Sequence, residues 1–185
     1  MSVTTIESTD LTQGTWNLDG SHSTVGFMVR HAGISKVRGQ FTEMEGSLTL
    51  GETLAETAVT ATIAAASFNS GDANRDAHVR GADFFDVEVF PTLTFVSTSV
   101  SGDEEEFEMT GELTIRGITK TVTFKGEFGG VAVDAFGATR AGFEAKTVIS
   151  RKDFGLTWNA ALEAGGVLVS DKVTITLEVA FVKAA

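Results

Sequence analysis

The sequence contains no cysteine and no tyrosine, and it has a single proline among its 185 residues. The lack of cysteine excludes disulfides, thiolate zinc sites, iron–sulfur clusters and thiol catalysis. No apolar stretch approaches the roughly 18–20 residues that a membrane-spanning helix needs. Nucleotide-binding motifs are also missing, because neither a G-x-G-x-x-G turn nor a P-loop occurs. These absences leave a single globular domain, which a chain of this length can form around one core.

Basic residues are scarce, with 14 lysines and arginines against 25 aspartates and glutamates and a formal net charge of −11. Both halves are acidic: residues 1–92 carry 12 acids and 5 bases, and residues 93–185 carry 13 acids and 9 bases. Such a chain repels nucleic-acid phosphates, and it repels anionic membrane leaflets unless a local basic patch intervenes. We expect no nucleic-acid partner.

Residues 1–14 are polar and rich in serine and threonine, which predicts a flexible N-terminal tail before one domain over residues 15–185. The start of the chain has no basic residue and no apolar run of about 7–15 residues, both of which a secretion signal needs. The sequence as written therefore predicts a cytoplasmic protein without a membrane span.

From Thr15 onward, apolar and polar residues alternate with a period of two, which is typical of half-buried strands. Near the C-terminus, for example, every second residue from Val173 to Phe181 is apolar, and the residues between them are mostly polar. The same pattern predicts strands over residues 15–19, 23–31, 40–50, 57–66, 92–100, 106–115, 121–128, 139–149 and 172–182.

Such clean alternation favours antiparallel strands with one solvated face. Eight or nine strands in an open sheet would leave edges prone to aggregation, and closure into a barrel removes those edges. The sequence therefore predicts an all-β fold, an antiparallel β-barrel of about eight strands. A two-sheet sandwich is the alternative.

Two segments interrupt the alternation. Residues 69–89 have helical spacing, with Ser70 or Asp72 as the N-cap and Gly81 as the C-terminal stop, and they predict one short helix. Residues 151–171 form a long connection, and long loops in compact domains tend to be lids or binding loops.

The predicted inward face combines aromatic with very small residues. The small residues are Gly111, Gly126, Ala61, Ala65, Ala141 and Ala145. Small residues in the middle of an inward face leave space, and a space lined by apolar side chains favours apolar guests. The same mixture also fits a packed core in which large and small side chains interdigitate. The composition leaves both interpretations open.

Three histidines, His22, His31 and His78, raise the question of metal binding or catalysis. His22 and His31 lie at the two ends of one expected strand, about 30 Å apart when extended, so they cannot share a metal. No serine lies in a recognisable nucleophile elbow. We expect no metal site, no resident cofactor and no catalytic residue. The alternative is a lipid-modifying enzyme that uses His31 or His78 as general base.

Many short motifs, in order and in spacing, resemble the YceI-like family. They include Trp16-Asn17-Leu18-Asp19, Asp171-Lys172-Val173, and the segments 22–31, 33–35, 39–41, 75–78, 83–86, 111–117 and 151–155. The agreement extends from about residue 15 to residue 182, which is nearly the whole chain.

This resemblance implies a lipocalin-like barrel with a long apolar channel. It implies a non-enzymatic carrier that holds a polyisoprenoid or similar long-chain lipid, such as a prenyl quinone or a prenyl phosphate, with roles in transport or stress responses. It also admits a homodimer. Many relatives are exported behind a signal peptide, which this sequence lacks as written. A packed barrel that serves as an interaction module without a ligand remains the alternative.

Fourteen residues are candidates for contact with such a guest. We expect the channel wall to include Phe27, Val29, Phe41, Ile63, Phe95, Phe124 and Phe143. We expect aromatic residues of the two irregular segments to gate the mouth, namely Phe84, Phe85, Phe154 and Trp158. The candidates for contact with a polar head group are His31, Arg75 and Arg151. For each residue, ordinary packing or structural ion pairing is the alternative role.

Overall fold

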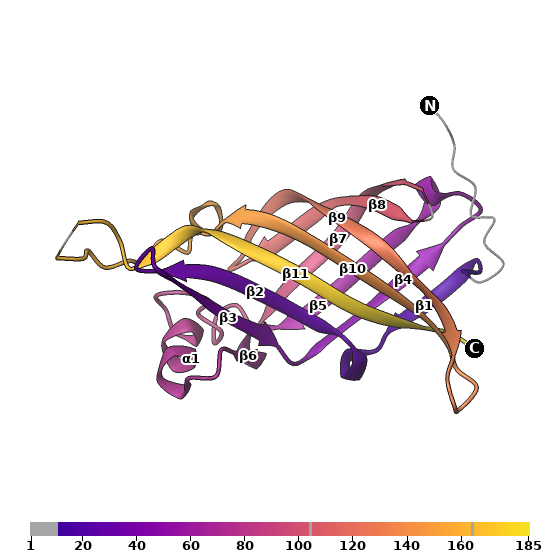
Figure 1. Ribbon diagram of the computed structural model, residues 1–185, viewed down its shortest axis with the longest axis horizontal. Helices are drawn as coiled ribbons and strands as arrows, with labels where there is room; N and C mark the ends of the chain where they lie inside the picture. The colour runs from indigo at the N-terminus through magenta and orange to yellow at the C-terminus, as the bar shows by residue number, and fades with distance from the viewer. Residues whose placement is uncertain (1–10, 104, 164) are drawn as a thin grey trace.

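The computed structural model describes residues 11–103, 105–163 and 165–185, and within them the strands form one antiparallel sheet (Figure 1). The strands are β1 (Gly14–Leu18), β2 (Thr24–His31), β3 (Ser35–Phe41), β4 (Met44–Leu50), β5 (Ala58–Ala64), β6 (Phe68–Asn69), β7 (Thr92–Gly102), β8 (Glu106–Ile115), β9 (Ile118–Val133), β10 (Thr139–Ser150) and β11 (Val169–Lys183). The helical elements are α1 (Ala73–Arg80) and four short 3-10 turns, η1 (Gly20–His22), η2 (Leu54–Glu56), η3 (Ala65–Ser67) and η4 (Arg151–Phe154).

The sheet closes into an eight-stranded barrel. Its circle runs β1-β4-β5-β7-β8-β9-β10-β11 and returns to β1 through the β1–β11 pairing. Three further strands, β2, β3 and β6, continue the paths of β1, β4 and β5 along the other half of the barrel. The prediction of a closed antiparallel barrel of about eight strands is confirmed.

The break between β1 and β2 occurs at η1, and the neighbouring strand β11 keeps its hydrogen bonds across this break. Asp19 donates its backbone N–H to the carbonyl of Ala180 at 2.9 Å. Ser23 then uses its hydroxyl, which accepts from the Ala180 N–H at 3.0 Å and lies 2.7 Å from the Asp19 carbonyl. These bonds connect the β1–β11 ladder to the β2–β11 ladder, so both strands belong to one path around the barrel.

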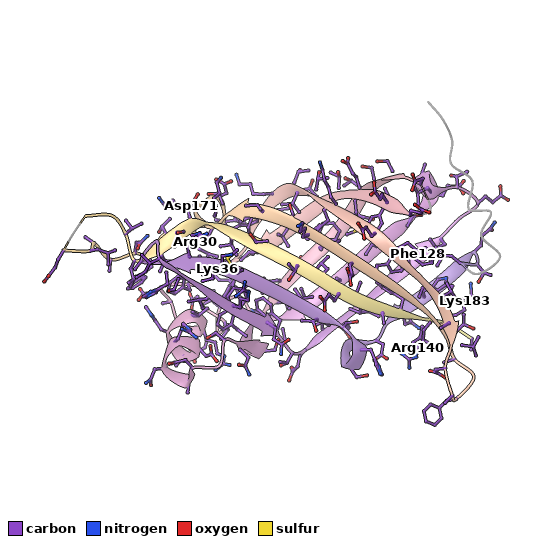
Figure 2. The ribbon with its side chains drawn as sticks, viewed as in Figure 1. Arg30, Lys36, Phe128, Arg140, Asp171 and Lys183 are labelled. Atoms are coloured by element: carbon purple, nitrogen blue, oxygen red, sulfur yellow. The ribbon has the colours of Figure 1, made fainter. Side chains whose placement is uncertain are left out.

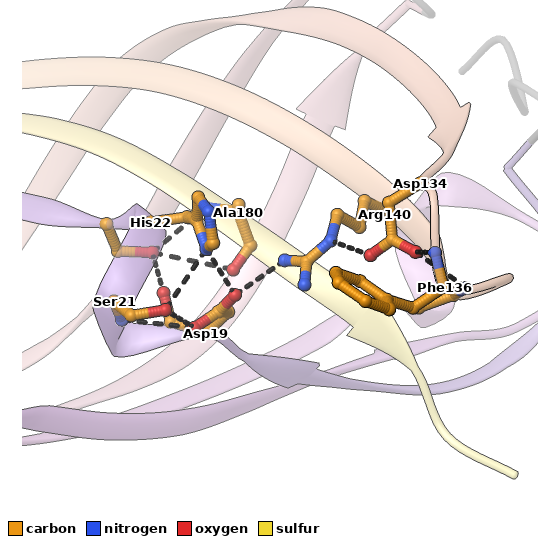
Figure 3. Close-up of polar contacts among 9 residues, drawn as sticks. Asp19, Ser21, His22, Asp134, Phe136, Arg140 and Ala180 are labelled. Carbon is orange, nitrogen blue, oxygen red and sulfur yellow. Dashed lines mark hydrogen bonds and ion pairs between the residues drawn. The ribbon is translucent and has the colours of Figure 1, made fainter.

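An ion-pair cluster, which we call the Arg140 clamp, joins this break to the β9–β10 hairpin (Figure 3). Arg140 lies 2.5 Å from Asp19 through Nη1 and 2.6 Å from Asp134 through Nε. Hydrogen bonds from Ser21 and Arg140 hold the pKa of the Asp19 carboxyl well below its ordinary value. A hydrogen bond from Arg140 likewise lowers the pKa of Asp134.

Alternating burial fills the barrel with two apolar clusters. The larger follows most of the length of the barrel and includes Phe95, Leu113 and Phe124. The smaller surrounds Trp16, whose side chain is fully buried and whose indole donates to the Thr12 carbonyl at 2.9 Å. Among the described residues, no helix is long and apolar enough to cross a bilayer.

The predicted helix is confirmed and lies against β6 at one end of the barrel (Figure 1). Asp72 is its N-cap and accepts from the Arg75 N–H at 2.9 Å. Gly81 ends it in an extended conformation. Arg80 fastens the helix by donating to the backbone carbonyls of Ala66 and Phe68, at 2.9 and 2.6 Å.

The predicted bounds of one strand are wrong. The single strand expected over residues 40–50 is two strands, because β3 ends at Phe41 and β4 begins at Met44, and β3 starts as early as Ser35. Residues 1–10 of the expected tail lie outside the described residues. Within the described part of that segment, Leu11 packs on the Trp16 cluster.

Candidate functional site

The barrel encloses an apolar cavity of about 620 Å³. Its wall consists mostly of inward-facing aliphatic and aromatic side chains from β2 to β11. Small-molecule sites span about 300–1,000 Å³ and are largely apolar with a few polar groups, and this cavity fits that description. The structure therefore favours the cavity over the fully packed interior that composition alone left open.

All but one of the predicted site residues line this cavity. From the strands the cavity receives Phe27, Val29, His31, Phe41, Ile63, Phe95, Phe124 and Phe143. From the two irregular segments and η4 it receives Arg75, Phe84, Phe85, Arg151 and Trp158. Phe154 is not in the wall; it is 1% exposed and packs in the larger core cluster. The role of each residue in ligand contact stays a prediction.

The inward glycines do not create the free space. A Cβ at Gly39 would collide with the Phe27 ring, one at Gly111 with Phe95, and one at Gly126 with the ring of Phe107. At each of these glycines, an aromatic ring from a neighbouring strand therefore occupies the space that a side chain would fill. The expectation that Gly111 and Gly126 leave volume is wrong because phenylalanine rings occupy that space. Ala61 and Ala145 do line the cavity.

All the arginines and histidines of the wall lie at the end formed by α1, the β2–β3 hairpin and residues 155–168, which we call the α1 end. They are Arg30, His31, Arg75, His78 and Arg151, with Asn74 beside them, whereas Thr57, Thr60 and Asp103 line the cavity from other parts of the barrel. Arg75 keeps its guanidinium next to Ser70, donating to the hydroxyl at 2.7 Å and the carbonyl at 2.9 Å. A guest lying along the barrel would thus meet apolar walls over most of its length and polar groups at this end.

Arg151 organises the 155–168 loop at the α1 end. The side chain is 3% exposed, and its guanidinium donates to the backbone carbonyls of Leu156, Trp158, Val169 and Ser170 at 2.6–3.1 Å. Burial lowers the pKa of this guanidinium, which nevertheless stays charged because arginine is not deprotonated in proteins. Arg151, which the sequence suggested for contact with a lipid head group, thus uses its guanidinium to hold the backbone of the loop.

Aromatic side chains connect this loop to the segment around α1. The Trp158 ring lies 4.7 Å from His78 and 5.5 Å from Phe84, as distances between ring centroids. His78 also hydrogen-bonds Asp83 through Nε2 at 2.9 Å. The loop and the segment around α1 therefore meet at aromatic contacts, and no backbone hydrogen bond joins them among the described residues.

Several wall residues were absent from the predicted site. The alternation signal covers those on long strands, for example Met109 and Leu113 on β8 and Ile175 and Leu177 on β11. Phe68 had no such signal because β6 is only two residues long. Its ring stacks on Phe27 at a centroid distance of 4.8 Å.

Comparison with known proteins identifies the family. The profile described as YceI-like domain matches residues 16–181. The chain belongs to the YceI-like family. Protein YceI of Escherichia coli O157:H7 is 40% identical over 139 residues, covering 75% of this chain and 73% of that protein. The UPF0312 protein plu2095 of Photorhabdus laumondii is also 40% identical over 139 residues, with coverage of 75% and 72%.

Solved structures share this YceI-like barrel. Burkholderia cenocepacia BcnA superposes with a TM-score of 0.74 at 25% identity, covering 88% of this chain and 98% of that one. The Campylobacter jejuni YceI protein gives 0.72 at 31% identity, with coverage of 84% and 90%. A polyisoprenoid binding domain from Saccharophagus degradans gives 0.70 at 13% identity over 91% and 98%, a likeness of fold alone.

Proposed function

We propose that this YceI-like protein is a non-enzymatic carrier of one long-chain apolar lipid, of the polyisoprenoid class. The apolar tail lies along the barrel, and the polar head lies at the α1 end. The observation that carries the proposal is the apolar cavity whose arginines and histidines all lie at one end. A structural neighbour described as a polyisoprenoid binding domain supports the choice of ligand class.

The driving force is burial of the tail. Transfer of hydrocarbon from water contributes about 0.8 kcal/mol per methylene, less the cost of immobilising its torsions. Each added isoprene unit should therefore tighten binding until the tail fills the cavity. The head group contributes orientation more than affinity, because the polar groups at the α1 end other than Arg151 are exposed to solvent.

The test compares an inward with an outward substitution on the same strand. Ala145 faces the cavity from β10, whereas Val148, three residues on, points outward and is 58% exposed. We expect Ala145→Phe to weaken binding of a prenyl quinone at least about tenfold, because the new ring occupies space that the tail needs. Val148→Phe adds the same ring outside the barrel and should bind as the wild type does.

Binding is measured by quenching of tryptophan fluorescence by the quinone, with thermal unfolding to show that both variants are folded. Trp158 lies in the cavity wall at the α1 end, and Trp16 is fully buried and outside the wall. The quenching should disappear in Trp158→Phe if the head lies at the α1 end. Equal affinity in Ala145→Phe and the wild type would contradict binding inside the barrel.

A further inference from the structure

The β2–β3 hairpin is a basic surface on an acidic protein. Residues 24–41 contain three basic side chains and no acidic one, in a chain of net charge −11. Arg30 lies directly opposite Lys36, and Arg38 lies opposite Met28, so the three cations share one face of the two strands, and all three are exposed. Figure 2 shows Arg30 and Lys36 at the end of the barrel from which the 155–168 loop projects.

These cations have no carboxylate partner in the part of the chain that the structure describes. The salt bridges found there involve other residues, and the carboxylate nearest along β11, Asp171, accepts from Ser150 at 2.6 Å and from the Lys152 N–H at 3.2 Å. Like charges directly opposite each other destabilise a strand pair. The Arg30–Lys36 pair therefore carries a repulsion that no salt bridge among the described residues offsets.

An apolar tip extends beyond the cations. Ile34, in the turn between β2 and β3, is 87% exposed, and Val167 of the neighbouring loop is 52% exposed. The two tips are tied together, because Ala32 donates its backbone N–H to the Leu168 carbonyl at 2.7 Å. In Figure 1 they project together from the same end of the molecule.

Basic residues can protect an exposed strand edge from pairing with another chain, but this role explains only part of the surface. β3 pairs with β6 at Gln40 and Phe41 alone, so lysine and arginine along the rest of this edge would discourage pairing with another chain. Arg30, however, lies on β2, which has β3 on one side and β11 on the other. Edge protection accounts for neither this third cation nor the exposed isoleucine.

We propose that the β2–β3 hairpin docks the protein on an anionic lipid bilayer, with Ile34 inserted and Arg30, Lys36 and Arg38 on the lipid phosphates. Apolar side chains surrounded by cations are the combination that binds such interfaces. At a Debye length of about 8 Å, the acidic groups at the far end of the barrel are screened from the bilayer. Arg30 and His31 also line the cavity, so docking would place its α1 end at the membrane.

The docking surface goes beyond the proposed carrier function and is tested without any guest lipid. The assay is flotation of the full chain with phosphatidylcholine vesicles, with and without one third phosphatidylglycerol. We expect binding only to the anionic vesicles, and we expect high salt to weaken it.

Two variants remove the docking elements. The triple variant Arg30→Gln, Lys36→Gln, Arg38→Gln should lower partitioning by roughly tenfold or more, since each basic residue near the surface adds to the attraction for anionic lipid. Ile34→Asp should lower it as well. All four side chains are exposed, so thermal unfolding should stay close to that of the wild type.

Two control variants make the same change in charge, or remove an apolar tip in the same way, at sites outside the β2–β3 hairpin. Lys120→Gln, Lys125→Gln and Lys146→Gln together remove three exposed cations from other strands. Phe136→Asp removes an apolar tip at the opposite end of the barrel, where Phe136 is 96% exposed. Both controls should float as the wild type does. Failure of the wild type to float, or equal losses in the controls, would overturn the docking surface while leaving the carrier proposal standing.

Discussion

A single buried arginine explains how a long loop is held at the mouth of the cavity. The guanidinium of Arg151 presents several donors in a rigid fork, and four backbone carbonyls between residues 156 and 170 converge on it. No salt bridge to Arg151 is found among the described residues. Its charge therefore stabilises the loop backbone directly.

We expect Arg151→Ala to lower the free energy of unfolding by about 3–4 kcal/mol, since four hydrogen bonds of roughly 1 kcal/mol each are lost. Arg151→Lys should recover only part of this loss, because an ammonium group cannot reproduce the fork. Urea unfolding measures both variants. Arg38→Ala, an exposed arginine on β3, is the control and should change stability by less than about 0.5 kcal/mol. A loss below about 1 kcal/mol in Arg151→Ala would contradict this role.

At the residue scale, the sequence predicted wall positions well and roles less well. Strand alternation places Phe95 and Phe124 inside because side chains on a strand point to opposite faces in turn. The bonds of Arg151 could not be predicted, since its partners are backbone carbonyls of an irregular loop. Aromatic rings pack against Gly39, Gly111 and Gly126 because of the register between neighbouring strands. That register cannot be predicted from composition.

At the scale of elements, hydrogen bonds and ion pairs bridge the break between β1 and β2. The Arg140 clamp ties the residue that precedes η1 to the β9–β10 hairpin, which lies across β11 from it (Figure 3). Asp19 also caps η1, since its carboxylate accepts from the Ser21 N–H at 3.0 Å. One carboxylate thus fixes both the turn and its attachment to the neighbouring strand pair.

This clamp predicts a dependence of stability on pH. The folded state lowers the pKa of Asp19 and Asp134 from the ordinary value of 3.8. Their contribution is therefore fully present above that pH and is lost as the pH falls below it. We expect the unfolding temperature of Arg140→Gln to fall less steeply than that of the wild type below about pH 4.

The measurement is thermal unfolding at a series of pH values from neutral to acid. Lys120→Gln removes an exposed cation that pairs with no carboxylate among the described residues, and it should keep the slope of the wild type. Other aspartates with a lowered pKa, such as Asp171, remain in both chains, so the difference isolates the clamp. An unchanged slope in Arg140→Gln would contradict it.

Elements were predictable where the alternation is long. The strands β7 to β11 and the helix α1 follow from their patterns and caps. β3 was missed over residues 35–39 because Val37 is the one large apolar side chain there. Gly39 has no side chain, and the ring of Phe27 from β2 occupies that space. The two-residue β6 is too short to carry any periodic signal.

At the scale of the whole molecule, closure of the barrel and its hollow interior have different origins. Closure follows from strand number and polarity, and it was predictable because eight or nine amphipathic strands need partners on both edges. The cavity depends on how inward side chains meet across the barrel, which only the folded chain decides. The cytoplasmic location stays a prediction, because nothing in the folded domain reports on the compartment.

The basic hairpin and the polar end of the cavity lie at the same end of the barrel. The α1 end carries the arginines and histidines of the wall, the loop held by Arg151 and the tip at Ile34. The opposite end carries the Arg140 clamp and the exposed Phe136. A carrier of this design would exchange its guest at the α1 end and keep the other end fixed.

The central claim is that the barrel holds a long-chain lipid, and native mass spectrometry of the protein purified without detergent tests it most directly. We predict one adduct per chain, with a mass that solvent extraction assigns to an isoprenoid or acyl lipid. A protein that shows only its bare mass, both as purified and after incubation with prenyl quinones and prenyl phosphates, would contradict the claim.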